Sequence, residues 1–134
     1  MNNRIYNDKV DVNNDNIREF YNKRAQKFIK GEKNQYTSVL LGDNNPEYAK
    51  KWDEFEKNYV GKYLNLGTDK KFLDIGCGIG RWAENVIDKC GQYVGTDFSI
   101  EMVKAARERF KEHSNAQFIN SSFQDIFNLS LIHI

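Results

Sequence analysis

The sequence predicts an α/β fold in which helices precede a strand–helix–strand–helix–strand unit that forms a parallel sheet with flanking helices. Two observations predict it. Helical periodicity dominates up to Gly67, and short apolar runs then alternate with helical patterns. In addition, a cluster of three glycines follows the first apolar run directly. Alternation of this kind is typical of parallel sheets with right-handed crossovers.

The size and composition of the chain exclude several classes of protein. Its 134 residues suffice for one domain, and 20 basic against 19 acidic residues give a net charge of +1, which disfavours a nucleic-acid binder. No apolar run reaches the roughly 20 residues that span a bilayer, and the polar N-terminus does not resemble a secretory signal. The two cysteines cannot form a disulfide framework, and no Cys/His cluster has zinc spacing. We therefore expect a cytoplasmic protein without metal or membrane partner, and the oligomeric state stays open.

The N-terminal half reads as a flexible lead-in over residues 1–15 and a helical segment over residues 16–67. In the first helix Ile17, Phe20, Tyr21 and Phe28 recur at steps near three and four, with Asp15 as a candidate cap. A second helix begins after the N-cap Asn45 and ends before Gly67. It carries a stripe of aromatic residues that we expect to lie in the core: Tyr48, Trp52, Phe55, Tyr59 and Tyr63.

Residues 68–128 carry the alternating elements. We expect strands at residues 71–75, 93–96 and 117–120, a helix at residues 81–90, and a second helix that Ser99 caps and that runs through Lys111.

The glycine cluster has the pattern D-x-G-x-G-x-G, from Asp74 to Gly80. A dinucleotide loop requires G-x-G-x-x-G with a small last residue, but Arg81 stands there, and no Lys-Ser/Thr follows to make a P-loop. The Asp74 carboxylate would attract a ligand with a cationic amino group or sulfonium. Asp97, at the end of the second strand, can accept hydrogen bonds from both hydroxyls of a ribose. A nucleoside with a cationic amino-acid tail fits both acids, and S-adenosylmethionine is such a molecule.

At these residues the chain resembles the class I S-adenosylmethionine-dependent methyltransferases, over about residues 16–127. Residues 72–82 (FLDIGCGIGRW) resemble the first motif of the family, residues 93–99 (YVGTDFS) the second, and residues 116–123 (AQFINSSF) the third. The resemblance implies a Rossmann-like sheet and S-adenosylmethionine as cofactor. It also implies one set of cofactor-binding residues: Asp74, Gly76, Cys77, Gly78, Gly80, Asp97, Phe98, Ser122 and Phe123.

Two parts of the resemblance are less specific. Ser122 stands where the family often has an acid that contacts the adenine amino group, and a hydroxyl can still form such a hydrogen bond. Residues 20–25 resemble the helix that often covers the cofactor, so Tyr21 and Arg24 are candidate cover residues for cofactor or substrate. No residue is assigned a catalytic role.

The family resemblance also implies further strands after residue 128, so we expect residues 68–128 to be a partial methyltransferase domain whose sheet has an open edge. Residues 129–134 (LSLIHI) are what translation of a sequencing-adapter end (CTG TCT CTT ATA CAC ATC) gives, so we interpret them as a non-native tail.

The expected function is methyl transfer from S-adenosylmethionine to an unidentified small-molecule acceptor, with this fragment inactive alone. Three alternatives remain open. They are a nicotinamide-dependent oxidoreductase, a non-catalytic interaction fragment, and a nucleic-acid methyltransferase.

Overall fold

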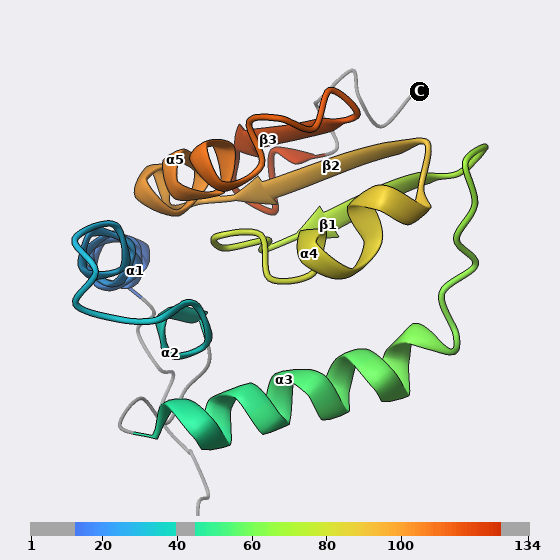
Figure 1. Ribbon diagram of the computed structural model, residues 1–134. Helices are drawn as coiled ribbons and strands as arrows, with labels where there is room; N and C mark the ends of the chain where they lie inside the picture. Colours follow the sequence, from blue (N-terminus) through green and yellow to red (C-terminus); the bar gives the residue numbers. More distant parts are fainter. Residues whose placement is uncertain (1–12, 40–44, 127–134) are drawn as a thin grey trace, which may run out of the picture.

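A computed structural model describes residues 13–39 and 45–126, and three parallel strands form its sheet (Figure 1). They are β1 (Lys71–Ile75), β2 (Gln92–Asp97) and β3 (Ala116–Asn120), in the order β1-β2-β3. The predicted α/β fold with a parallel sheet is confirmed. Most of the expected lead-in and the expected tail at residues 129–134 lie outside the described residues.

The strand register brings the carboxyl ends of the strands to one edge of the sheet. Asp74 of β1 lies opposite Gly95 of β2, and Asp97 of β2 lies opposite Asn120 of β3. The two acids that the sequence singles out therefore project from neighbouring strands near the same edge, which is where parallel α/β sheets bind ligands.

Short helices make the two crossovers. A four-residue helix, α4 (Ala83–Val86), and a 3-10 turn, η1 (Ile87–Lys89), connect β1 to β2, so the helix predicted for residues 81–90 is shorter than expected. Between β2 and β3 runs α5 (Ile100–Arg109), and the Ser99 side chain caps it by accepting a hydrogen bond from the Met102 amide, as predicted. Their buried faces meet the sheet in a core that includes Tyr93, Val103 and Phe118.

Helix α1 (Asn14–Ile29) packs beside α5 (Figure 1). Asn13 caps it by accepting hydrogen bonds from two backbone amides, so the expected cap Asp15 is wrong and the boundary placed at residue 15 falls in the first turn. A small cluster of Ala25, Met102 and Ala105 joins the two helices. The five-residue helix α2 (Gln35–Val39), too short to leave a periodic signal, was not predicted.

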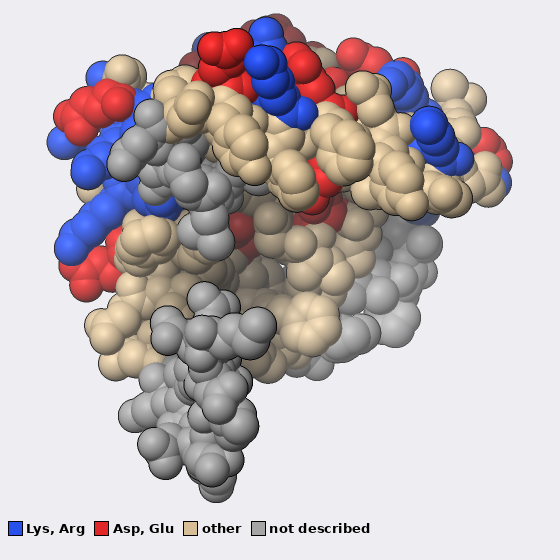
Figure 2. Space-filling model, turned by 90° about the horizontal axis from the view of Figure 1, so that it is seen from below, with Lys and Arg blue, Asp and Glu red and all other residues tan. Residues whose placement is uncertain are grey.

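Helix α3 (Pro46–Gly61) begins after the N-cap Asn45, as predicted, but its aromatic stripe is not core. Phe55 is 59% exposed, and the five aromatic side chains range from 46% to 75% exposed. Charged side chains account for this orientation, because Asp53, Glu56 and Lys57 form ion pairs with residues around the glycine loop. The helix thus turns Asp53, Glu56 and Lys57 inward. Uncharged side chains cover much of the side seen in Figure 2, where Lys and Arg lie among Asp and Glu along the margin.

Strand β1 forms an edge of the three-stranded sheet, as the sequence predicts. Its Leu73 and Ile75 side chains are 43% and 48% exposed. Within the described ranges, no helix has the length and apolar character needed to cross a bilayer.

Candidate functional site

The glycine loop between β1 and α4 adopts a conformation that only glycine takes easily. Gly76, Gly78 and Gly80 have φ angles of 76°, 55° and 84°. The amides of Gly76 and Cys77 both donate to the Thr96 carbonyl, at 2.7 and 2.9 Å, which holds the loop against the end of β2. The three alternate glycines of the sequence pattern are thus the residues of the loop at which the backbone has positive φ.

A cleft of about 310 Å³ opens beside this loop. It is bounded by the ends of β1 and β2, the loop, the start of α4 and residues of α1 and α5. The lining residues are Tyr21, Asp74, Gly76, Cys77, Gly78, Arg81, Trp82, Asp97, Phe98 and Met102.

Asp97 fixes the loop from the end of β2. Its Oδ2 accepts a hydrogen bond from the Gly78 amide at 2.9 Å, and its Oδ1 accepts one from the Ser99 amide at 2.9 Å. Burial raises the pKa of this carboxyl, while the backbone donors act in the opposite direction. Because each carboxylate oxygen can accept a second hydrogen bond, Asp97 retains acceptor capacity for a ligand.

Asp74 lies at the other side of the cleft. Its Oδ2 accepts a hydrogen bond of 2.6 Å from the hydroxyl of buried Tyr93. Burial raises the pKa of Asp74, and the Tyr93 hydrogen bond and the charge of Arg81 oppose that rise. Two partly desolvated carboxylates in one small cleft make it a favourable place for a cation or for donors of hydrogen bonds.

A second cleft of about 260 Å³ adjoins the first. Both are lined by Gly76, Asp97 and Phe98, so these residues mark their junction. The Thr96 hydroxyl, which belongs to the second cleft, is buried and has no hydrogen-bond partner in the described part of the chain. Beyond the junction, Ile75, Ser121, Ser122, Phe123, Gln124, Ile126 and Asn14 complete the lining. An elongated ligand could place its charged end at Asp74 and a planar group beyond Phe98.

The structure brings most of the predicted site residues together. Tyr21, Asp74, Gly76, Cys77, Gly78, Asp97 and Phe98 line the larger cleft, and Ser122 and Phe123 line the second. Gly80 is buried and lines neither cleft. Arg24 is also outside both, since its Nε donates to the Ser38 carbonyl at 3.0 Å and links α1 to α2. The Ser122 hydroxyl donates to Asp125 at 2.5 Å.

Two chemical details bear on the predicted residues. Burial raises the pKa of the Cys77 thiol, so this residue contributes a protonated side chain and its backbone to the loop. Tyr21 contacts Phe98 edge-on, with ring centroids 6.1 Å apart, which places an α1 side chain against the junction of the clefts.

Sequence reasoning missed several lining residues. Met102 gave a signal that could have found it, because it lies three residues after the cap Ser99 and so in the first turn beside the end of β2. Asn14 gave none, since only the packing of α1 beside the sheet edge brings it there. Arg81 and Trp82, which directly follow the glycine cluster in the sequence, also line the larger cleft.

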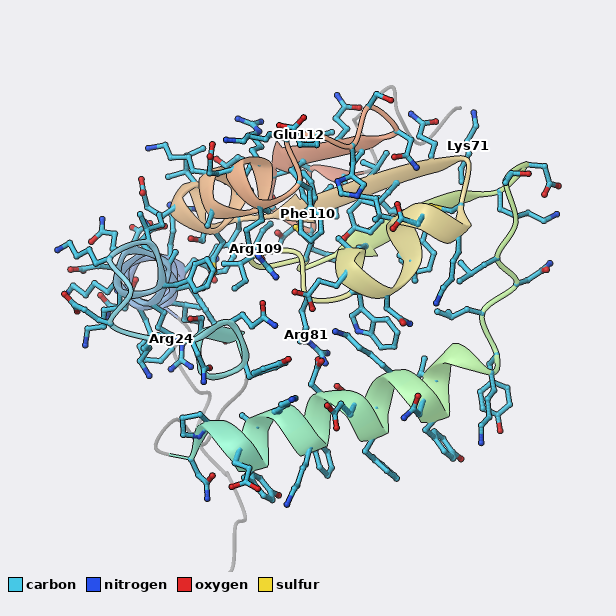
Figure 3. All side chains as sticks on the ribbon, in the orientation of Figure 1. Arg24, Lys71, Arg81, Arg109, Phe110 and Glu112 are labelled. Carbon is cyan, nitrogen blue, oxygen red and sulfur yellow. The ribbon has the colours of Figure 1, made fainter. Side chains whose placement is uncertain are left out.

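Arg81 joins the loop to α3, and Figure 3 shows its side chain in the space between them. Its Nη1 lies 2.9 Å from Asp53 Oδ1 and 2.6 Å from Glu56 Oε2. Burial acts against the charge of Arg81, yet the hydrogen bonds of the two carboxylates raise its pKa. The guanidinium is therefore held at the cleft by α3.

Residues 72–130 match the family model described as "Methyltransferase domain". This match confirms that the segment resembles methyltransferase domains, as the sequence motifs indicate. The chain is 43% identical over 49 residues to an uncharacterized methyltransferase of Schizosaccharomyces pombe, covering 37% of this chain and 19% of that one. It is 46% identical over 57 residues to phosphoethanolamine N-methyltransferase 1 of Zea mays, covering 42% and 11%.

A solved structure supports the fold over most of the chain. Phosphoethanolamine N-methyltransferase 1 of Haemonchus contortus, in complex with phosphoethanolamine and S-adenosylhomocysteine, aligns with a TM-score of 0.61 at 20% identity. The alignment covers 83% of this chain and 22% of that one. The chain thus spans about a fifth of the first curated relative and of this structure.

Proposed function

We propose that this chain binds S-adenosylmethionine in the two adjoining clefts and belongs to an enzyme that transfers its methyl group to a small-molecule acceptor. One observation carries the proposal. Asp97, which is buried, and Asp74, which is partly buried, flank the glycine loop at the carboxyl edge of a parallel sheet.

Each part of the ligand has a group suited to it. Asp74 and the loop backbone would hold the methionine portion, whose amino group is cationic, and Asp97 would accept hydrogen bonds from the ribose hydroxyls. Phe98, Ser122 and Phe123 would border adenine in the second cleft, which Thr96 also lines. Tyr21 would close over the junction from α1.

Methyl transfer requires little of the protein beyond alignment of the methyl donor with the acceptor. When bound, S-adenosylmethionine supplies a methyl group that its sulfonium already activates. The loop, Asp74 and Asp97 would fix the position of that methyl group relative to an approaching nucleophile. An acceptor hydroxyl would benefit from a general base, whereas an amine or carboxylate needs less help. We assign no base among the described residues.

A small-molecule acceptor is favoured by two observations. On the face seen in Figure 2, basic side chains lie among acidic ones, whereas a nucleic-acid enzyme would gather a basic patch. Two of the similar proteins are phosphoethanolamine N-methyltransferases by name. These similarities support an acceptor of the small, polar kind.

The nicotinamide alternative makes a distinct prediction. A dinucleotide loop needs a small residue where this chain has Arg81, whose guanidinium lines the cleft. Calorimetry should therefore detect binding of S-adenosylhomocysteine and none of NAD. Binding of NAD alone would favour the oxidoreductase, and binding of neither would contradict the proposal.

A pair of variants tests the assigned site. Asp97→Asn removes a charge and one acceptor at the ribose position, and we expect at least a ~10-fold loss of affinity for S-adenosylhomocysteine. Asp69→Asn changes an exposed aspartate outside the clefts and should leave affinity unchanged. Equal affinities of the two variants would overturn the assignment of Asp97.

A further inference from the structure

Tyr93 is a buried residue to which the proposed function assigns no role. Its ring stacks on Phe72, with centroids 5.9 Å apart and planes 8° from parallel, and lies 5.5 Å from the Phe118 ring. A phenylalanine would satisfy these apolar contacts. The hydroxyl, however, reaches Asp74 Oδ2 at 2.6 Å, so the position carries a polar group for a reason that packing does not supply.

The register of the sheet explains why Tyr93 reaches this acid. Asp74 lies directly opposite Gly95, which offers it no side chain. Tyr93 precedes Gly95 by two residues, and residues two apart in a strand share a face. A Cβ at Gly95 would come within 2.9 Å of the Phe118 ring and 3.0 Å of Cys77, so this position has no room for a polar side chain of its own.

The hydrogen bond from Tyr93 makes the two carboxylate oxygens of Asp74 inequivalent. Oδ2 is occupied by Tyr93, whereas Oδ1 has no hydrogen-bond partner within residues 13–39 and 45–126. Burial and the nearby Asp74 charge raise the pKa of Tyr93, so its hydroxyl keeps its proton and acts only as the donor. The Tyr93 bond also lowers the pKa of Asp74 against the effect of burial.

We propose that Tyr93 is a positioning residue for ligand binding: it orients Asp74, keeps the carboxylate charged, and leaves Oδ1 to receive the cationic amino group of the ligand. This inference rests on the proposed function. Other groups that face or adjoin Asp74 also act on its charge: Arg81 favours it, and Asp97 opposes it. Burial raises the pKa of the Cys77 thiol, which shares the larger cleft with Tyr21, and Glu56 lines a hollow on the α3 side.

The test compares Tyr93→Phe with the matched change Tyr59→Phe on the exposed face of α3. Affinity for S-adenosylhomocysteine is measured by calorimetry from pH 5 to pH 8. Tyr93→Phe should weaken binding about 10-fold near neutral pH and shift the midpoint of the pH dependence upward, whereas Tyr59→Phe should change neither. Unchanged affinity and midpoint in Tyr93→Phe would overturn the inference.

A double-mutant cycle separates positioning from packing. In an Asp74→Asn background the carboxylate is gone, so Tyr93→Phe should have little further effect on affinity. The same loss in both backgrounds would show that Tyr93 acts on the fold alone and would contradict the inference.

The proposed function can fail while the link between Tyr93 and Asp74 holds. If the unsubstituted chain does not bind S-adenosylhomocysteine, that function is overturned for this chain. The link between Tyr93 and Asp74 is then decided by NMR titration of the Asp74 carboxyl carbon in the ligand-free protein. A higher pKa in Tyr93→Phe supports the link, and an unchanged pKa contradicts it.

Discussion

Arg81 of the glycine loop and Asp53 of α3 form an ion pair, with 2.9 Å between Nη1 and Oδ1, that connects segments 28 residues apart. Their side chains are 18% and 3% exposed. Lys57 approaches the other Asp53 oxygen at 2.8 Å, so the carboxylate is enclosed by two cations. This pair fixes which face of α3 turns toward the cleft.

Removal of the Arg81 charge should therefore destabilise the fold. We expect Arg81→Met to lower the free energy of unfolding by about 3 kcal/mol, because it leaves Asp53 buried with Lys57 alone. Urea unfolding measures the change. Arg18→Met is the matched control, since the pair of Arg18 with Asp15 is exposed and should contribute less than about 1 kcal/mol. Similar losses in both variants would contradict the structural role of Arg81.

Two glycines of the loop should respond differently to alanine. Both have positive φ, but a Cβ at Gly80 would collide with the Phe110 ring, whereas a Cβ at Gly76 meets nothing within 4 Å. We expect Gly76→Ala to cost about 1–2 kcal/mol for the backbone alone. Gly80→Ala should cost about 3 kcal/mol or more because overpacking adds to it. Urea unfolding of the two variants measures both costs, and a larger loss in Gly76→Ala would contradict the geometry.

The raised pKa of Asp74 gives a pH dependence of known sign. The folded chain binds this proton more tightly than the unfolded chain, whose aspartates titrate near 3.8. The resulting contribution to stability is complete below that value and is lost as the pH rises through the raised pKa. Asp74→Asn avoids the loss, so its melting temperature should exceed that of the unsubstituted chain by about 2–4 °C at pH 7.5, and the difference should shrink at pH 4.5.

Differential scanning calorimetry at the two pH values checks this prediction. Asp69→Asn, at an exposed position, serves as the control and should show a small difference that does not depend on pH. A constant offset between Asp74→Asn and the unsubstituted chain would show that ionisation of Asp74 does not oppose folding.

The outward orientation of the aromatic stripe is testable on α3 itself. Phe55→Gln replaces an exposed ring with a good helix former, and it should change the free energy of unfolding by no more than about 0.5 kcal/mol. Ala49→Gln, on the buried face, should destabilise the fold by about 2 kcal/mol because the larger side chain does not fit. Urea unfolding gives both values, and the reverse order would place the stripe in the core.

The N-terminal helices show where sequence reasoning reached its limit. Periodicity located α1 and α3, and the Asn45 cap was read correctly because its hydrogen bond is local. The prediction that the aromatic stripe of α3 lies in the core was wrong. Aromatic side chains at helical spacing predict a buried face, but the ion pairs of Asp53, Glu56 and Lys57 with residues 25 or more positions away decide otherwise.

The candidate site, too, could be predicted from the sequence only in part. The D-x-G-x-G-x-G pattern and Asp97 indicated the chemistry from sequence alone, because glycine conformation and strand-end acids are local properties that the parallel register then brings together. The hydrogen-bond partners of Asp74 and Asp97 could not be predicted from the sequence. That Tyr93 holds Asp74 depends on the pairing of β1 with β2 and on the absence of a side chain at Gly95.

The sequence by itself determined the three strands, the helices α1, α3 and α5, the glycine loop and the two acidic residues of the clefts. Periodicity, capping and backbone freedom act over a few residues, so they can be read from the sequence. Only the tertiary structure decided that Arg24 links α1 to α2, that Arg81 pairs with α3, and that Tyr93 donates a hydrogen bond to Asp74. These roles depend on contacts between distant segments, whose geometry follows from the packing of the whole chain.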